Sequence, residues 1–511
     1  MLFNSLEFIL VFLPLTLVAF FLVSRYLRPR FGSEVLFFVL SAASLLFYSY
    51  WYWPNIFVLL SSILVNFTLG QWITRSDDQK QRKIWCCVGV ALNLAVIGYF
   101  KYFNFFSENI TGLFGHDHTA LKIMMPLGIS FFTFQQIAYL VDCYRDNVKA
   151  RSLLEYTFFV SFFPQLIAGP IVLYKTLREQ YSDPSFGTFK INYFVVGVVL
   201  FTMGLGKKIL IADHLSLISQ PVFTRADLGE TLQFFEAWAG ILAYTYQLYF
   251  DFSGYSDMAI GLALLIGLKL PINFDSPYKA TSIIEFWRRW HITFSNFLRD
   301  YLYIPLGGSK QGAQRTAINL LLVMFLGGLW HGAAWTFVFW GCLHGAFLVV
   351  NHTYRRIKKG EGGVFSFAPI AYLTTMMSVA LSWVFFRAES FQGAWNIIST
   401  MFGKNKILMP SEIHSRLPEA THSFLLLESE KDLLFWTGSL TWDAFPFIVI
   451  IAFCALLLPS TTDIYRKFMS DEQGGVKTLN PAFGLFLGVI FTLCILLLYA
   501  NSASEFLYFQ F

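Results

Sequence analysis

Asp251-Phe-Ser-Gly-Tyr-Ser-Asp257 is a polar stretch between two long apolar runs. A carboxylate placed alone at the middle of a bilayer costs about 2.5–3.5 kcal/mol on insertion scales. Two of them so close together predict oppositely charged partners or water among packed helices. Ser253 and Tyr255 would then line the same polar interior. The alternative is a structural network of ion pairs that locks the helices together without taking part in chemistry.

The rest of the chain is strongly apolar. Of its 511 residues, 56% are hydrophobic and only 14% are charged, with a mean hydropathy of +0.55. Soluble domains carry roughly 25% charged residues, so most of this surface must face lipid. At about 20 apolar residues per crossing, we expect one all-α polytopic membrane domain of about 11–13 helices over 1–511. The apolar segments lie near 5–23, 34–52, 55–73, 84–100, 123–141, 153–172, 191–212, 233–250, 255–270, 316–335, 337–353, 368–386, 444–460 and 482–500.

Basic residues between these segments predict which loops face the cytoplasm, because cytoplasmic loops are rich in lysine and arginine. The loops after the first, third and fifth segments are basic, as are those near 355–359 and 466–477. Both termini should therefore lie on the outer side. The first segment has no basic leader and no small-residue cleavage site, so we expect a membrane span and not a removable signal.

Two segments depart from this regular pattern. Segment 153–172 contains Pro164 and the pair Gly169-Pro170. We expect it to be broken or re-entrant, which is tolerated at membrane depth only inside protein or beside water. The longest polar connection, 387–443, should be an extracytoplasmic loop.

Residues 282–302 predict an amphipathic helix. Ser282 and Glu285 form a capping box at its start, and its aromatic side chains share one face. The other face is charged, and His291 and Ser295 lie along the boundary. Such a helix would lie at the interface or line a cavity. Its arginines would pair with the buried carboxylates or, alternatively, bind anionic lipid headgroups. These arginines are Arg288, Arg289 and Arg299.

A histidine occurs in an apolar hairpin, in the run Gly-Gly-Leu-Trp330-His331-Gly at 327–332. The glycines permit close helix packing and would leave the imidazole accessible to a thin substrate. A neutral histidine is the natural general base near neutral pH. A packed histidine without a catalytic role is the alternative. His344, in the same hairpin, is a second candidate whose role the sequence leaves open.

The spacing of the cysteines and the distribution of the basic residues give no indication of a metal site or a nucleic-acid interface. The six cysteines lie in or beside apolar segments without the CxxC spacing of a zinc site or redox motif, so we expect neither a metal centre nor a disulfide framework. The net charge of +5 is confined to short loops between apolar runs. It therefore gives no reason to expect nucleic acid as a partner.

Four runs of sequence around these residues resemble the membrane-bound O-acyltransferase (MBOAT) family. The likeness is greatest to bacterial members that acetylate polysaccharides such as alginate. It covers nearly the whole chain, with 387–443 as the weakest match. The four runs lie at 247–261, 285–292, 298–303 and 327–332.

This resemblance implies a ring of helices around a central funnel, with re-entrant or interfacial helices. It implies that His331 is essential, that His291 is a second functional histidine, and that Trp330 lies beside the tunnel. The chain would lie in the bacterial inner membrane, with both termini periplasmic. Acetyl groups would enter from the cytoplasm, with acetyl-CoA as the expected donor and no permanently bound cofactor. The acceptor would be an exopolysaccharide, alginate by preference, reached directly or through periplasmic acetylation proteins.

The chemistry of thioesters agrees with these residues. A thioester is already activated, so the reaction needs a base at the acceptor hydroxyl and a donor at the carbonyl oxygen. We assign the base to His331 and the polarising role to His291 or a nearby donor. The chain has no GxSxG elbow and no Cys–His pair, which favours direct transfer over a covalent enzyme intermediate.

Other functions remain open at this point. Close variants would acetylate cellulose or peptidoglycan instead of alginate, while D-alanylation of teichoic acid fits less well. A transporter or flippase could be built around the same buried carboxylates, although we find no clear internal repeat. A third possibility is a scaffold that only recruits periplasmic acetylation proteins.

Overall fold

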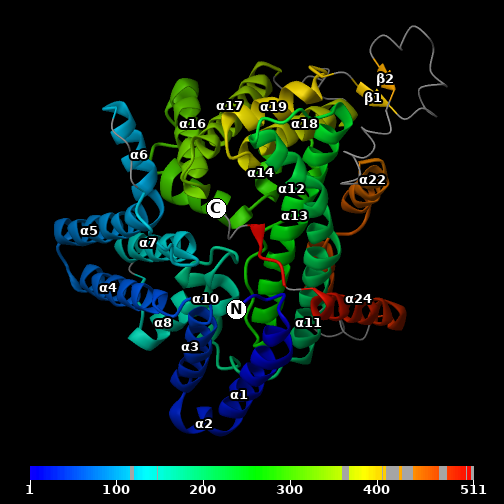
Figure 1. The fold of residues 1–511 in the computed structure, drawn as a ribbon. Helices are drawn as coiled ribbons and strands as arrows, with labels where there is room; N and C mark the ends of the chain where they lie inside the picture. The colour runs from blue at the N-terminus through cyan, green and yellow to red at the C-terminus, as the bar shows by residue number, and fades with distance from the viewer. Residues whose placement is uncertain are drawn as a thin grey trace.

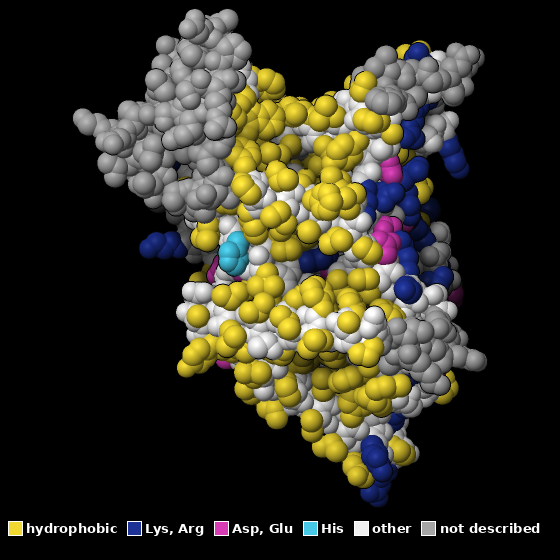
Figure 2. Space-filling view, turned by 90° about the vertical axis from the view of Figure 1, so that its right-hand side faces the viewer, with side chains coloured by type: hydrophobic (Ala, Val, Ile, Leu, Met, Phe, Trp, Pro, Cys, Tyr) yellow, Lys and Arg dark blue, Asp and Glu magenta, His cyan; other side chains and the backbone are white. Residues whose placement is uncertain are grey.

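The computed structural model describes residues 1–115, 120–146, 148–358, 368–405, 407–409, 425–427, 441–470, 480–501 and 503–507. These residues are almost entirely helical, and two three-residue strands among them pair in parallel, β1 (Ile407–Met409) and β2 (Leu425–Leu427). Eight of the described helices are long and apolar enough to cross a membrane. Hydrophobic side chains also cover much of the described surface on the face in Figure 2. The predicted all-α polytopic membrane fold is confirmed.

The elements of the first half of the chain are η1 (Phe8–Phe12), α1 (Leu13–Tyr26), α2 (Arg28–Phe31), α3 (Glu34–Ser49), α4 (Asn55–Arg75), α5 (Gln79–Ile97), η2 (Gly98–Tyr102), α6 (Phe103–Leu113), α7 (Ile129–Asp146), α8 (Leu153–Ser161), α9 (Phe163–Leu166), α10 (Tyr174–Tyr181), α11 (Ile191–Gly206), η3 (Lys207–Ala212) and α12 (Asp213–Asp227). Those of the second half are α13 (Phe234–Leu265), η4 (Pro277–Lys279), α14 (Ile283–Arg289), α15 (Ile292–Leu298), η5 (Arg299–Tyr303), α16 (Gly312–His331), α17 (Trp335–Lys358), α18 (Ala368–Arg387), α19 (Phe391–Met401), α22 (Thr441–Leu457), α23 (Thr461–Ser470) and α24 (Pro481–Ala500). Figure 1 shows their arrangement.

Helix α13 is the central element of the molecule (Figure 1). Its 32 residues are buried along almost their whole length, and at 1.5 Å per residue it is about 48 Å long. The two apolar runs predicted around the polar stretch are therefore one continuous helix. Helix α11 packs closely against it, because glycines face each other across the contact. A Cβ on Gly204 would lie 2.5 Å from the carbonyl oxygen of Gly254.

The irregular segment at 153–172 is broken, as predicted. Helix α8 ends at Ser161. The next residue, Phe162, has a φ of -50° and a ψ of 108°, which leave the helical region, and α9 begins directly after it. Residues 158–172 are all buried. This non-helical backbone is therefore enclosed by protein and not by lipid, as a bilayer requires.

The amphipathic segment is not the single helix predicted over 282–302. It consists of α14, α15 and the π-helical turn η5. Ser282 caps α14 as expected, because its hydroxyl accepts a hydrogen bond from the Glu285 amide at 3.2 Å. The helix then stops at Trp290, and His291 adopts a φ of 43°. The residue at this break, His291, is fully buried.

Helices α16 and α17 form a close antiparallel hairpin, and His331 is the last residue of α16. Gly328 and Gly341 face each other across it, and a Cβ on Gly328 would lie 2.3 Å from the carbonyl oxygen of Phe337. Helix α18 then packs beside α17. The predicted extracytoplasmic loop at 387–443 opens with helix α19, and most of its remaining residues lie outside the described part of the chain.

Candidate functional site

The structure brings together the two histidines that the sequence places 40 residues apart. The ring centroids of His291 and His331 lie 6.4 Å apart. His331 is the last residue of α16, and His291 is the residue on which α15 begins. His331 is 5% exposed and His291 is 0% exposed. Two imidazoles are thus held side by side in the interior.

Aromatic rings from four helices enclose the pair. The ring centroids around His331 are those of Trp330 at 4.9 Å, Trp340 at 5.1 Å, Phe386 at 5.2 Å and Phe294 at 5.3 Å. Trp330, predicted to line the tunnel, also stacks on Phe294 at 4.6 Å. Such an apolar lining keeps bulk water away from the imidazoles, so that a reactive acyl group there is protected from hydrolysis.

Asn273 fixes the orientation of His291. The side-chain oxygen of Asn273 accepts hydrogen bonds from the amide and the hydroxyl of Thr293, at 3.3 and 2.9 Å. Because the Thr293 amide can only donate, this oxygen is an acceptor, and His291 Nδ1 at 3.1 Å must donate to it. Burial also lowers the pKa of His291 below its usual value. The ring is therefore neutral near pH 7, and its Nε2 carries a lone pair.

The backbone of Asn273 also holds the break in the helix. Its carbonyl oxygen accepts a hydrogen bond from the Ile292 amide at 2.9 Å. A positive φ is uncommon outside glycine, and this strand-like pairing stabilises it at His291. Asn273 was not singled out from the sequence, because its distance from His291 along the chain gives no sign of contact.

His344 belongs to a separate hydrogen-bonded chain behind the site. Trp287 Nε1 lies 3.3 Å from His344 Nδ1, and Ser382 Oγ lies 2.8 Å from His344 Nε2. Both ring nitrogens are thus occupied by neighbours on α14 and α18. This arrangement fits a structural role that ties α14 to the α17–α18 pair.

The buried carboxylates pair with lysines and not with the predicted arginines. Asp251 accepts from Lys208 at 2.7 Å and Asp257 from Lys207 at 2.7 Å. Both lysines lie in η3, the turn between α11 and α12. Asp251 also accepts a hydrogen bond from the Leu507 amide at 3.0 Å. The two carboxylates therefore hold α13, η3 and the C-terminal segment together, which is the structural alternative considered from the sequence.

The other predicted site residues lie around this network or at the surface. Ser253 is 3.4 Å from Lys207 Nζ, and Tyr255 stacks against Phe3 at 4.9 Å. Ser295 donates to the Trp290 carbonyl oxygen at 3.4 Å. Of the predicted arginines, Arg289 pairs with Glu285 in an i,i+4 salt bridge at 2.9 Å, Arg299 pairs with Asp300 at 2.7 Å, and Arg288 is exposed.

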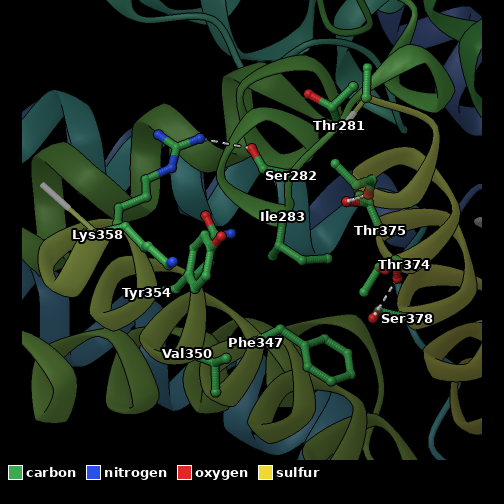
Figure 3. A pocket seen from close by; sticks show the side chains of 14 residues that line it. Thr281, Ser282, Ile283, Phe347, Val350, Tyr354, Lys358, Thr374, Thr375 and Ser378 are labelled. Atoms are coloured by element: carbon green, nitrogen blue, oxygen red, sulfur yellow. Dashed lines mark hydrogen bonds between the residues drawn. The ribbon is translucent and has the colours of Figure 1, made fainter. Parts of the chain in front are cut away.

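A pocket with a cavity volume of about 610 Å³ lies at the opposite end of α14 from His291. Hydroxyl groups and cations line it together with apolar side chains (Figure 3). Arg355 donates to Ser282 Oγ at 3.0 Å at its rim. The basic loop predicted to be cytoplasmic begins here. Its lining residues are Thr281, Ser282, Ile283, Phe347, Val350, Asn351, Tyr354, Arg355, Lys358, Ala368, Ala371, Thr374, Thr375 and Ser378.

Within the described residues, no group of three or more His, Cys, Asp and Glu side chains is placed to hold a metal ion. What the geometry does provide is two adjacent imidazoles, at least one of them neutral, in an apolar enclosure. Such groups can accept and return a proton during the transfer of an acyl group to a hydroxyl.

Comparison with known proteins identifies the family. The sequence model of the membrane-bound O-acyltransferase family matches residues 92–360. The peptidoglycan O-acetyltransferase of Helicobacter pylori is 36% identical over 542 residues, which cover 100% of this chain and 98% of that protein. The probable alginate O-acetylase AlgI of Pseudomonas putida is 34% identical over the full length of both chains. That of Azotobacter vinelandii is 40% identical over 79% of this chain and 78% of its own. The chain therefore belongs to the membrane-bound O-acyltransferase family and is a multi-pass membrane O-acyltransferase.

Proposed function

We propose that this chain is an O-acetyltransferase that takes an acetyl group from a thioester donor on the cytoplasmic side of the bacterial inner membrane. It passes the group to a polysaccharide beyond that membrane, directly or through a periplasmic acetylation protein. The observation that carries this proposal is the pair of enclosed imidazoles, His291 and His331, 6.4 Å apart at the meeting point of α15 and α16.

His331 is the general base of the proposed transfer. It accepts the proton of the acceptor hydroxyl while the hydroxyl oxygen forms a bond to the thioester carbonyl carbon. The tetrahedral intermediate then collapses, the C–S bond breaks, and the departing sulfur takes the proton from the imidazolium. A positioned general base contributes about 10²–10⁴ in rate, and enclosure of both reactants adds an orientation effect.

His291 serves as a hydrogen-bond acceptor beside His331 in this scheme. With Nδ1 donating to Asn273, its Nε2 has no hydrogen to offer. A neutral His291 therefore cannot polarise the thioester carbonyl from that nitrogen, which was its expected role. Its Nε2 lone pair can instead accept a hydrogen bond from a group bound beside His331, while His331 alone carries the proton of the reaction.

The basic pocket supports a cytoplasmic donor that carries phosphate groups, such as acetyl-CoA. Arg355 and Lys358 offer cations at its rim, and hydroxyl groups line its wall (Figure 3). Arg355 is 15 residues from Trp340 on α17, or about 22 Å at 1.5 Å per residue. Trp340 packs on His331. That separation is the distance that a donor bound at the pocket would have to span to reach His331.

Two acceptors have support from relatives. Alginate is the first candidate, since a relative named probable alginate O-acetylase AlgI matches this chain over its full length. Peptidoglycan is the second, because a relative named peptidoglycan O-acetyltransferase also covers the whole chain. Both acceptors present sugar hydroxyls, so the same proton transfer serves either one.

The test measures acetyl transfer by the purified full-length chain in lipid nanodiscs. Labelled acetyl-CoA is the donor, and alginate oligosaccharides or peptidoglycan fragments are the acceptors. We expect His331→Ala to lower transfer by at least about 10²-fold, consistent with loss of a general base. Ester-linked acetyl in each polymer from cells with and without the gene identifies the natural acceptor. Undiminished transfer by a folded His331→Ala variant would contradict the proposal.

A further inference from the structure

A lysine from a distant helix is bound to the backbone of the catalytic helix end. Lys101 lies in η2, a π-helical turn after α5. Its ammonium donates to the carbonyl oxygens of Trp330 and His331 at 2.7 and 2.9 Å. It also lies 3.5 Å from Ser130 Oγ and 6.0 Å from the centroid of the Trp330 ring.

The same turn satisfies a third carbonyl of α16. The Tyr102 hydroxyl donates to the carbonyl oxygen of Leu329 at 2.8 Å. The last carbonyls of a helix have no partner within it and carry the negative end of the helix dipole. Two consecutive side chains of η2 thus bind three consecutive carbonyls at the end of α16.

The partners of Lys101 explain why a cation is tolerated here. The structure shows no salt bridge between Lys101 and a carboxylate in the described residues. Its charge is instead balanced by the helix dipole and two carbonyl oxygens. Placing a lysine partly inside the protein at membrane depth costs free energy, and a side chain needed only for packing would not justify that cost. This suggests a role that requires the charge at this place.

We propose that Lys101 is a positioning residue for His331 in the acetyl transfer described above, on which this inference rests. It clamps the final turn of α16, so that the imidazole keeps one place relative to His291. It also places its amino group 2.9 Å from the backbone carbonyl oxygen of His331. The titratable and charged groups that face His331 are His291, His344 and Lys101. Of these, Lys101 in its protonated form discourages protonation of the base before the acceptor arrives.

The substitution Lys101→Met keeps the length of the side chain and removes the charge and the hydrogen bonds. We expect kcat for acetyl transfer to fall about ten- to hundredfold, the effect of losing a charge-assisted hydrogen bond. The KM for acetyl-CoA should change little, because Lys101 is not among the residues that line the pocket at Arg355. The acidic limb of the pH–rate profile should move to higher pH, since the protonated imidazole loses a repelling neighbour. Lys101→Arg, which keeps both charge and donors, should retain most of the activity and the original profile.

Lys279→Met is the matched control. Lys279 also donates to the carbonyl oxygen of a residue at a helix end, Leu458 at 3.1 Å, but away from His331. All variants are assayed in nanodiscs and normalised to folded protein by thermal unfolding. The inference is overturned if Lys101→Met has the kcat and pH profile of the original chain, or if Lys279→Met lowers kcat equally. If the unsubstituted chain transfers no acetyl, the proposed function itself is wrong, and this inference is then wrong with it. Any other failure concerns Lys101 alone.

Discussion

Asn273 is a residue on which the chemistry of His291 depends. Its side-chain oxygen sets the tautomer, and its backbone oxygen holds the positive φ of the same residue. We expect Asn273→Ala to lower acetyl transfer about ten- to hundredfold, because a buried imidazole loses its hydrogen-bond acceptor. The loss should appear in kcat, measured with acetyl-CoA and an alginate oligosaccharide.

A buried asparagine outside the site separates this effect from general destabilisation. Asn319 is 1% exposed and donates to the carbonyl oxygens of Leu306 and Gly308 at 3.2 and 3.0 Å. Asn319→Ala should lower the melting temperature but leave kcat per folded molecule unchanged. Equal loss of kcat in both variants would mean that Asn273 has no special relation to His291.

At the scale of elements, the α16–α17 hairpin sets the position of His331. Gly328 has no room for a side chain, since its Cβ would lie 2.3 Å from the Phe337 carbonyl oxygen and 3.0 Å from the Cα of Gly341. We expect Gly328→Ala to force the helices apart, with a loss of about 1–3 kcal/mol in the free energy of unfolding. Acetyl transfer should fall at least about tenfold, because misplacement of a catalytic group by about 1 Å is costly.

The control for this prediction lies in α24. A Cβ on Gly488 would meet nothing within 4 Å, so Gly488→Ala should change neither stability nor transfer. Both variants are measured by thermal unfolding and by acetyl transfer in the same nanodiscs. A Gly328→Ala variant that matches Gly488→Ala would show that the hairpin can open without cost.

At the scale of the whole molecule, one ion pair joins three parts of the chain. Lys208 in η3 binds Asp251 on α13, and Asp251 binds the amide of Leu507 near the C-terminus. The C-terminal segment thereby reaches the middle of the molecule (Figure 1). We expect Lys208→Met to lower the free energy of unfolding by about 3–5 kcal/mol, because it leaves a buried carboxylate without its partner.

A second substitution checks that cause. Asp251→Asn removes the charge and keeps an oxygen for the Leu507 amide, so the double variant Lys208→Met with Asp251→Asn should recover much of the lost stability. Unfolding is followed by thermal denaturation of the detergent-solubilised chain. If the single and double variants melt at the same temperature, charge pairing is not what holds these parts together.

The sequence alone determined what depends on local composition. Apolar segments predicted a membrane-embedded all-α chain, the prolines and glycine of 153–172 predicted a broken segment, and Ser282 marked the start of a helix. His331 and His291 were both singled out, and the structure places them together. These features follow from hydropathy, capping and chain stiffness, which act over a few residues.

Only the tertiary structure decided which distant groups meet. The sequence favoured arginines of 282–302 as partners of Asp251, whereas helix packing brings Lys208 to it. Asn273 and Lys101 carry no local sign of their contacts with His291 and the end of α16. The physical reason is that the spacing of residues along a helix predicts which face is buried. It does not predict the rotation and depth at which that face meets another helix.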